Sequence, residues 1–143
     1  MMLADLLEST GLDVLDHLET QVAIPVLGGL QAQGDLIVIP RGLLDDVVVP
    51  EWAVHRDVPA SGLELLRSAT GGNPHTLVAD PDTCTWTDWV RDPTGLAIGL
   101  LRATASAYLI HPEHGGSGIA PGEYVVRRQR ERGSSRPTRL IAD

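Results

Sequence analysis

Residues 22–49, VAIPVLGGLQAQGDLIVIPRGLLDDVVV, decide how this sequence folds. Three short runs rich in valine and isoleucine lie in this stretch, at residues 22–27, 35–39 and 47–49, and glycine or proline separates each run from the next. β-Branched residues favour extended backbone, whereas glycine and proline favour turns. The stretch therefore predicts short strands joined by tight connections.

The same pattern continues toward the C-terminus, so we expect a mainly β fold. The chain contains ten prolines and fifteen glycines and no stretch of helical length between predicted strands, which favours a small antiparallel barrel or sandwich over a parallel sheet. Residues 96–110 are ambiguous, but Gly95 and Gly99 favour one strand, or two strands that meet at a bend near Ala105. The other predicted strands are Leu63–Leu66, Thr76–Ala79, Thr83–Thr87 and Tyr124–Arg130.

The segment before residue 21 has a helical pattern instead. Apolar residues recur at helical spacing between Leu3 and Leu18, and acids lie between them. We expect one helix over residues 2–20 that is broken at Gly11, or two short helices. The whole chain is expected to form a single domain, with a helical cap at residues 1–20, a β domain at 21–132 and a flexible tail at 133–143.

Composition excludes several kinds of chemistry and compartment. The chain has no lysine, which rules out Schiff-base catalysis, a P-loop and a Ser/Lys dyad. Its single cysteine, Cys84, cannot form an intramolecular disulfide and suits a reducing compartment. No apolar run is long enough to span a bilayer, and the N-terminus lacks the basic residues of a secretory signal. We therefore expect a cytoplasmic protein that has no membrane partner.

The net charge of −8 is unevenly distributed along the chain. Residues 1–122 hold sixteen acids and five arginines, whereas residues 123–143 hold six arginines and three acids. An acidic body repels nucleic acid, so any such binding would be confined to the tail. Because the arginine fork pairs well with carboxylates, we expect the arginines of the final strand to contact carboxylates, either in the acidic body of the same chain or in a neighbouring subunit. The candidate partner-binding residues are Arg127, Arg128, Arg130 and Arg132.

Histidines provide the other candidate site. In residues 111–116, HPEHGG, extended backbone would place His111 and Glu113 on one face, and the two glycines would let the chain bend so that His114 joins them. His75 opens a predicted strand and could approach from a neighbouring one. Two or three imidazoles with a carboxylate suit zinc, iron or manganese. The alternative is that these histidines bond to turn carbonyls and fix loop geometry, with no cofactor.

Four segments follow a shared pattern: Gly34-Asp35-Leu36-Ile37-Val38, Val58-Pro59-Ala60, Gly72-Asn73-Pro74-His75, and a closing run from His111-Pro112-Glu113-His114-Gly115 through Pro121 and Tyr124 to Arg128-Gln129-Arg130-Glu131. The pattern resembles a family of small, uncharacterised actinobacterial and phage-associated proteins, over roughly residues 33–132. That family carries two histidines in the segment that matches residues 72–75, the second of them at the position of His75, which implies a ligand supply like that of a cupin metal site. Here Asn73 replaces the first of them and Arg132 replaces a closing tyrosine. Three interpretations stay open. Either three ligands suffice to hold a metal ion, or this chain has lost a site that its relatives keep, or the motif is structural in the whole family.

The expected function is that of a non-catalytic binding or assembly module. Its acidic N-terminal helix and arginine-rich final strand are complementary surfaces that would pair head to tail in homo-oligomers. The alternative is a cupin-like metal-dependent enzyme, in which His75, His111 and His114 are ligands and Glu113 is a fourth ligand or general base. The distance between the rings of His75 and His111 discriminates between the assembly module and the metal-dependent enzyme, because side chains that share one ion must approach within about 5 Å.

Overall fold

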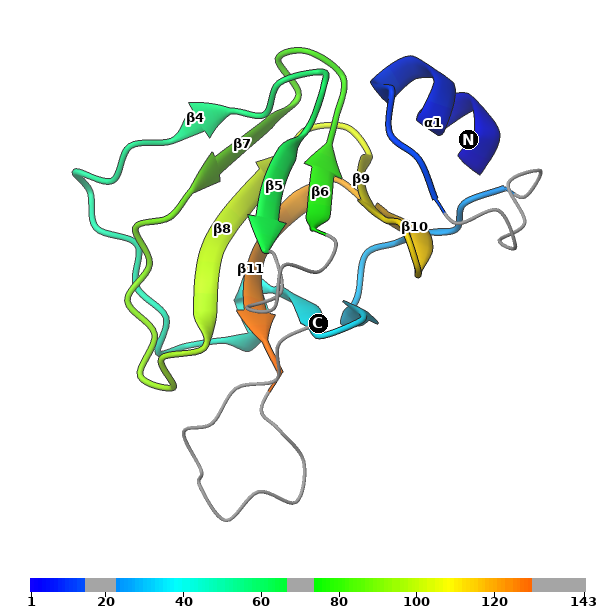
Figure 1. Ribbon diagram of the computed structural model, residues 1–143. Coiled ribbons are helices and arrows are strands. Elements are labelled where there is room, and N and C mark those ends of the chain that lie inside the picture. Colours follow the sequence, from blue (N-terminus) through cyan, green and yellow to red (C-terminus); the bar gives the residue numbers. More distant parts are fainter. Residues whose placement is uncertain (15–22, 67–73, 130–143) are drawn as a thin grey trace.

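The computed structural model describes residues 1–14, 23–66 and 74–129, in which two β-sheets pack against each other (Figure 1). The first sheet has five strands, in the order β1 (Val26–Leu27), β10 (Gly115–Ile119), β9 (Ala107–His111), β6 (His75–Val78) and β5 (Leu63–Leu66). The second has six, in the order β2 (Gln31–Gln33), β3 (Leu36–Pro40), β11 (Gly122–Arg128), β8 (Ala97–Ala103), β7 (Cys84–Thr87) and β4 (Arg56–Asp57). One 3₁₀ turn, η1 (Arg41–Leu43), follows β3.

The mainly β prediction is confirmed, and of the two expected architectures the protein adopts the sandwich. Strand pairing is antiparallel within both sheets, apart from the short parallel pair of β1 with β10. Neither sheet closes on itself, so each keeps two edges, and β4 forms one edge of the six-stranded sheet. A barrel would have removed these edges.

The main core lies between the two sheets. Side chains alternate along a strand, so Leu77 of β6 and Leu109 of β9, which are partners in register, both point toward the second sheet. There they meet Leu101 of β8 and Val126 of β11 in one fully buried cluster. Burial of each such side chain stabilises the fold by about 2 kcal/mol, so this cluster supplies much of the driving force for packing.

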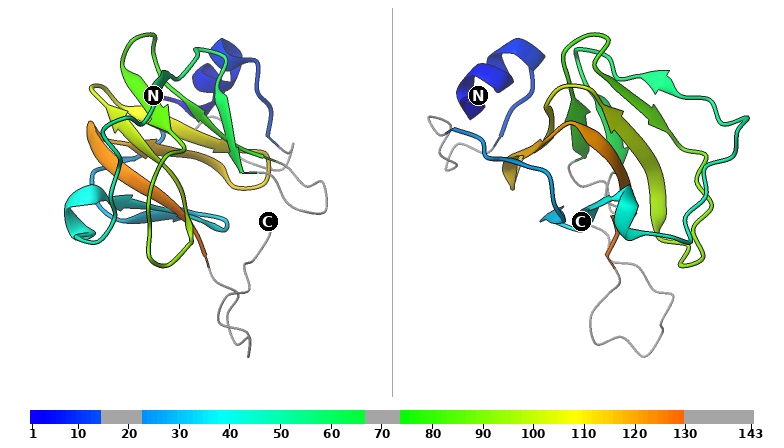
Figure 2. Two further views of the ribbon diagram at one scale, coloured as in Figure 1. Left: turned by 90° about the vertical axis from the view of Figure 1, so that its left-hand side faces the viewer. Right: turned by 180° about the vertical axis from the view of Figure 1, so that it is seen from behind.

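A second, smaller core lies on the opposite face of the five-stranded sheet, beneath α1 (Leu3–Thr10). Leu3 and Leu6 of α1 pack there against Val78 and Ile110, and both views of Figure 2 show α1 beside β9 and β10. The predicted break is confirmed at Gly11, which has a φ of 72° and donates its N–H to the carbonyl oxygen of Leu7. The rest of the expected helix falls largely on residues 15–22, outside the described residues. No helix in the described part of the chain is long and apolar enough to cross a bilayer.

Most predicted strands are present, and the strands that the sequence did not indicate share one cause. The stretch 96–110 forms β8 and β9 with a bend between Ala103 and Ala107, as predicted. The sequence did not indicate β2, β4 or the glycine-rich β10, which form strands because a neighbouring strand supplies their hydrogen bonds. Of the predicted strand at residues 47–49, only Val48 pairs, in an isolated bridge with Arg91.

Cys84 lies in the core between the sheets and is 2% exposed. Burial raises the pKa of its thiol to about 11, because the charged thiolate is poorly solvated there. The thiol therefore stays protonated at neutral pH and does not act as a nucleophile.

Candidate functional site

Three of the predicted site residues lie together at one end of the inter-sheet core. His75 begins β6 and His111 ends β9, and the alternation that turns Leu77 and Leu109 inward also turns these two rings inward. Their ring centroids lie 4.4 Å apart, and the ring of His114 lies 4.5 Å from that of His111 and 6.3 Å from that of His75. His75 and His111 are buried, whereas His114 is an exposed residue of the turn between β9 and β10. The rings of His75 and His111 therefore lie within the 5 Å that two side chains sharing one metal ion require.

Two buried polar residues that the sequence did not indicate hold His75 in place. Gln33 donates from Nε2 to the carbonyl oxygen of Leu109 and to Oγ of Ser117, both at 3.0 Å. Its amide oxygen therefore faces Nδ1 of His75, also at 3.0 Å, and Nδ1 must carry a proton to bond to it. The other ring nitrogen, Nε2, lies 3.2 Å from Oδ1 of Asp35, so these two atoms share a proton.

This polar cluster also connects the two sheets. Gln33 lies on β2 and Asp35 precedes β3, both in the six-stranded sheet, while His75 lies on β6 of the other. Gln33 and Asp35 are each 4% exposed, and buried polar groups must be hydrogen-bonded to avoid a cost of about 1–3 kcal/mol apiece. The network therefore orients the His75 ring and aligns the sheets at the same time.

The structure corrects the predicted backbone conformation of Glu113. Residues 112–114 form a turn rather than extended backbone, so Glu113 does not share a strand face with His111. Instead its backbone N–H donates to Nδ1 of His111 at 3.0 Å, and its side chain is exposed. Nδ1 of His111 is therefore unprotonated, which places the proton of the neutral ring on Nε2. The Asp35 carboxylate, which the sequence did not indicate, lies against the ring of His75.

The cluster has some of the properties of a metal centre. Two ligand atoms on one tetrahedral zinc, at bonds of about 2.0–2.1 Å, lie about 3.3 Å apart, which matches the 3.2 Å between Nε2 of His75 and Oδ1 of Asp35. The bond from Nδ1 of His75 to Gln33 is the kind of outer contact that orients metal-binding imidazoles. His111 fits less well. The N–H of Glu113 already bonds to its Nδ1, and its other ring nitrogen, Nε2, would have to lose its proton before it could bind a metal ion. In the described residues, no three His, Cys, Asp or Glu side chains are already placed to hold one ion.

A local signal for Gln33 and Asp35 is present in the sequence. They flank Gly34 immediately before the apolar run of residues 36–39, and Gly34 has a φ of 57°, a conformation that favours glycine. A glutamine and an aspartate at the start of a buried strand would usually be solvated. Which partners bury them depends on β6 and β9, which lie far away in the sequence.

Of the two expected kinds of carboxylate partner, one within the chain is present for the arginines of the final strand. Arg127 is bonded within its own chain, since its Nε and Nη2 donate to the two carboxylate oxygens of Asp92 at 3.0 and 2.9 Å. Arg128 is half-buried and pairs in register with Leu36. Arg130 and Arg132 lie outside the described residues. The final strand therefore uses Arg127 to fix the loop before β8.

Burial by itself would raise the pKa of the Asp92 carboxyl, but hydrogen bonds from Thr94 and Arg127 outweigh that effect and lower the pKa below its usual value. Asp92 also accepts a bond from the backbone N–H of Ala97, and its side chain is 1% exposed. Its ionised form is therefore part of the folded state.

Replacing Asp92 with asparagine is expected to lower the free energy of unfolding by about 3 kcal/mol, because Arg127 loses its paired charge in a largely buried position. In the unsubstituted protein the contribution of Asp92 is present above the ordinary aspartate pKa and is lost as pH falls toward its lowered pKa. Urea unfolding at pH 7 and at decreasing pH measures both effects. The exposed variant Asp45→Asn is the control, and equal stability of the two variants at pH 7 would contradict the assignment.

An exposed apolar surface lies on the segments next to the β4 edge of the six-stranded sheet. We give the name tryptophan surface to Trp52 and Trp89 together with Val48 and Val54, which lie near Trp52 in the chain, and each of these side chains is at least half exposed. The rings of Trp52 and Trp89 pack edge to face, with centroids 5.0 Å apart. The sequence did not single out these residues, because the contact joins the segment after η1 to the segment after β7.

The backbone beneath the tryptophan surface is well anchored. Val48 and Arg91 exchange two backbone hydrogen bonds, of 2.9 and 2.8 Å, and the N–H of Trp89 donates to Oγ1 of Thr87. Charged residues of both signs border the surface. Those on exposed positions are Glu51, Arg56, Asp88 and Arg91, of which Arg56 and Asp88 lie 3.7 Å apart.

Residues 32–129 match a family described as a domain of unknown function (DUF8820). The chain belongs to this family. No curated protein and no solved structure matches the chain. The match agrees with the resemblance to an uncharacterised family that the sequence motifs indicated.

The family region includes both features described above. Gln33, Asp35 and the three clustered histidines lie within residues 32–129, as do all four residues of the tryptophan surface. Helix α1 lies before it.

Proposed function

We propose that this chain is a non-catalytic assembly module that forms a homodimer through the tryptophan surface. The contact between Trp52 and Trp89 carries the proposal, since 60% of the first side chain and 52% of the second are exposed. Tryptophan is the residue most enriched at the energetic centres of protein interfaces. Large apolar side chains that gather on an anchored surface are typical of interaction sites rather than of free surface.

A second copy of the chain is the partner that this surface suits best. In a two-fold interface the same patch meets itself, so it must be self-complementary. The apolar centre of the tryptophan surface meets this condition, and its border supplies both Arg91 and Glu51, which can pair across a two-fold axis. The competing form is the head-to-tail arrangement, which pairs the acidic helix with the arginine-rich strand. In that strand Arg127 is already bonded to Asp92 of its own chain, so this form has less support than the two-fold one.

Light scattering and sedimentation of the full chain at increasing concentration test the proposal. A mass twice that of the 15.3 kDa chain, little changed by salt, is expected for an apolar interface. Association that weakens steeply with salt would favour the head-to-tail arrangement. A monomer at high micromolar concentration would overturn both.

A second candidate function is the binding of a divalent transition metal ion at the histidine cluster, as in a cupin-like metal-dependent enzyme. The approach of three imidazoles and the Asp35 carboxylate at one end of the core favours it. In this proposal His75 and Asp35 bind the ion, and His114 completes the site by a change of side-chain conformation. Binding would displace the proton that His75 shares with Asp35, and the resemblance to actinobacterial and phage-associated proteins supports the same idea.

Adding zinc, manganese or iron(II) to metal-free, untagged protein is expected to raise its midpoint of thermal unfolding if this second proposal holds. An ion at a concentration 100 times its Kd stabilises the fold by about 2.7 kcal/mol. His114→Ala should remove most of the effect without unfolding the protein, because His114 is exposed, and His55→Ala is the control outside the cluster. The proposal fails if elemental analysis finds less than about a tenth of an equivalent of metal and no ion raises the midpoint.

A further inference from the structure

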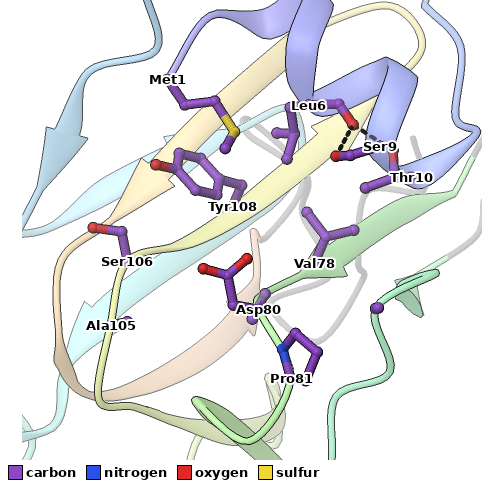
Figure 3. Close-up of a pocket in the computed structure, with 12 residues that line it drawn as sticks. Met1, Leu6, Ser9, Thr10, Val78, Asp80, Pro81, Ala105, Ser106 and Tyr108 are labelled. Carbon is purple, nitrogen blue, oxygen red and sulfur yellow. Dashed lines mark hydrogen bonds between the residues drawn. The ribbon is translucent and has the colours of Figure 1, made fainter.

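A cavity of about 200 Å³ lies between α1 and the part of the five-stranded sheet where β6 ends and β9 begins (Figure 3). Leu6 of α1 and Val78 of β6 form part of its apolar wall, and Pro81 closes it below. We call it the α1 cavity. It is separate from the histidine cluster, since it lies on the opposite face of β6 and β9, where Val78 and Tyr108 point.

One charged side chain and one aromatic ring line this cavity. Asp80 is the only residue with a charged side chain among those that line it, and Figure 3 shows its carboxylate pointing toward the space beside the ring of Tyr108. Asp80 accepts bonds from Thr83 through its backbone oxygen, so the turn is held without its carboxylate. The carboxylate is therefore available to a bound molecule.

The hydroxyl groups on the helical side are already in use. Ser9 and Thr10 both donate to the carbonyl oxygen of Leu6, at 3.0 and 2.8 Å, and Figure 3 shows these bonds. They are thus occupied as donors. Asp80 is the charged side chain of the lining, and the other charged group on a lining residue is the amino terminus of Met1, so a molecule that binds beside Asp80 and Tyr108 meets a negative charge. A carboxylate, a ring face and apolar walls together favour a cation that carries alkyl groups.

We propose that the α1 cavity binds a small organic cation of the alkylammonium class. The Asp80 carboxylate pairs with the positive charge, the ring of Tyr108 contacts the same charge through its face, and Leu6 and Val78 contact the alkyl groups. An uncharged molecule of equal shape would keep the apolar contacts and lose both electrostatic ones. The site thus discriminates by charge rather than by size.

Choline and its uncharged isostere, 3,3-dimethylbutan-1-ol, are suitable probes for the full chain. In ¹H–¹⁵N correlation spectra, choline is expected to cause saturable shifts at the amides of residues 78–80 and 106–108. The isostere should bind about tenfold more weakly, and Asp80→Asn should weaken choline binding by about the same factor. Tyr108→Leu should weaken choline more than the isostere.

Asp82→Asn is the matched control, because Asp82 lies two residues from Asp80 and does not line the cavity. Asp82 has a φ of 65°, a conformation that asparagine also accepts, so the variant should fold. Equal effects of the two substitutions would mean that choline responds only to the net negative charge of the chain, and the proposal would be wrong. It would also be wrong if the isostere bound as well as choline, or if no saturable shifts occurred at these amides.

Discussion

Replacing Trp52 with alanine is expected to raise the dimer dissociation constant by about 30-fold or more, since tryptophans at interface centres contribute about 2 kcal/mol or more. The side chain is mostly exposed in the single chain, so the variant should fold normally. Trp89→Ala should have a similar effect, and the double variant should cost less than the sum because the two rings contact each other. Sedimentation equilibrium measures the dissociation constants.

Leu30→Ala is the matched control for the tryptophan variants. Leu30 is 62% exposed, about as much as Trp52, but it lies between β1 and β2, away from the tryptophan surface. Its replacement should leave the dissociation constant unchanged. If Leu30→Ala weakened the dimer as much as Trp52→Ala, the interface would have to be placed elsewhere on the molecule.

Replacing Gly99 with alanine is expected to lower the free energy of unfolding by about 3 kcal/mol or more, and the midpoint of thermal unfolding by about 10 °C. A Cβ at this position of β8 would overlap the ring of Trp86 and lie 2.6 Å from the carbonyl oxygen of Thr87. The ring cannot move aside, because it is buried in the core and its Nε1 donates to Asp88 at 2.7 Å. Thermal and urea unfolding measure the loss.

Gly42→Ala tests whether this effect comes from overpacking. A Cβ on Gly42 would meet nothing within 4 Å, and this glycine does not have a positive φ. The variant should be as stable as the unsubstituted protein or slightly more stable, because alanine restricts the unfolded chain. A loss of stability as large as that of Gly99→Ala would contradict the explanation from packing.

The local pattern of the sequence was enough for the fold class and for several element boundaries. Alternating β-branched runs with glycine and proline indicate strands, and they placed the bend between β8 and β9 correctly. The helix break at Gly11 follows from the ease with which glycine adopts a positive φ. These features depend on residues close together in the chain, so a single sequence contains the information that they need.

The composition of the candidate sites depended on which strands became neighbours. The sequence indicated His75, His111 and His114 but not Asp35, whose carboxylate lies 3.2 Å from Nε2 of His75. Arg127 was expected to pair with a carboxylate, and Asp92 is the one that binds it because β11 pairs with β8 next to the loop that carries Asp92. The sequence pattern shows which residues can bond, and the register between strands selects which ones do.

The amino-acid sequence by itself determined that this protein is mainly β, that its helix ends at Gly11 and that three histidines are candidates for one site. Only the tertiary structure decided that the sheets form a sandwich, that Gln33 and Asp35 orient His75, and that Trp52 meets Trp89 on the surface. The physical reason is one of range. Backbone preferences act over a few neighbouring residues, whereas these contacts arise when burial of the apolar core brings distant segments together.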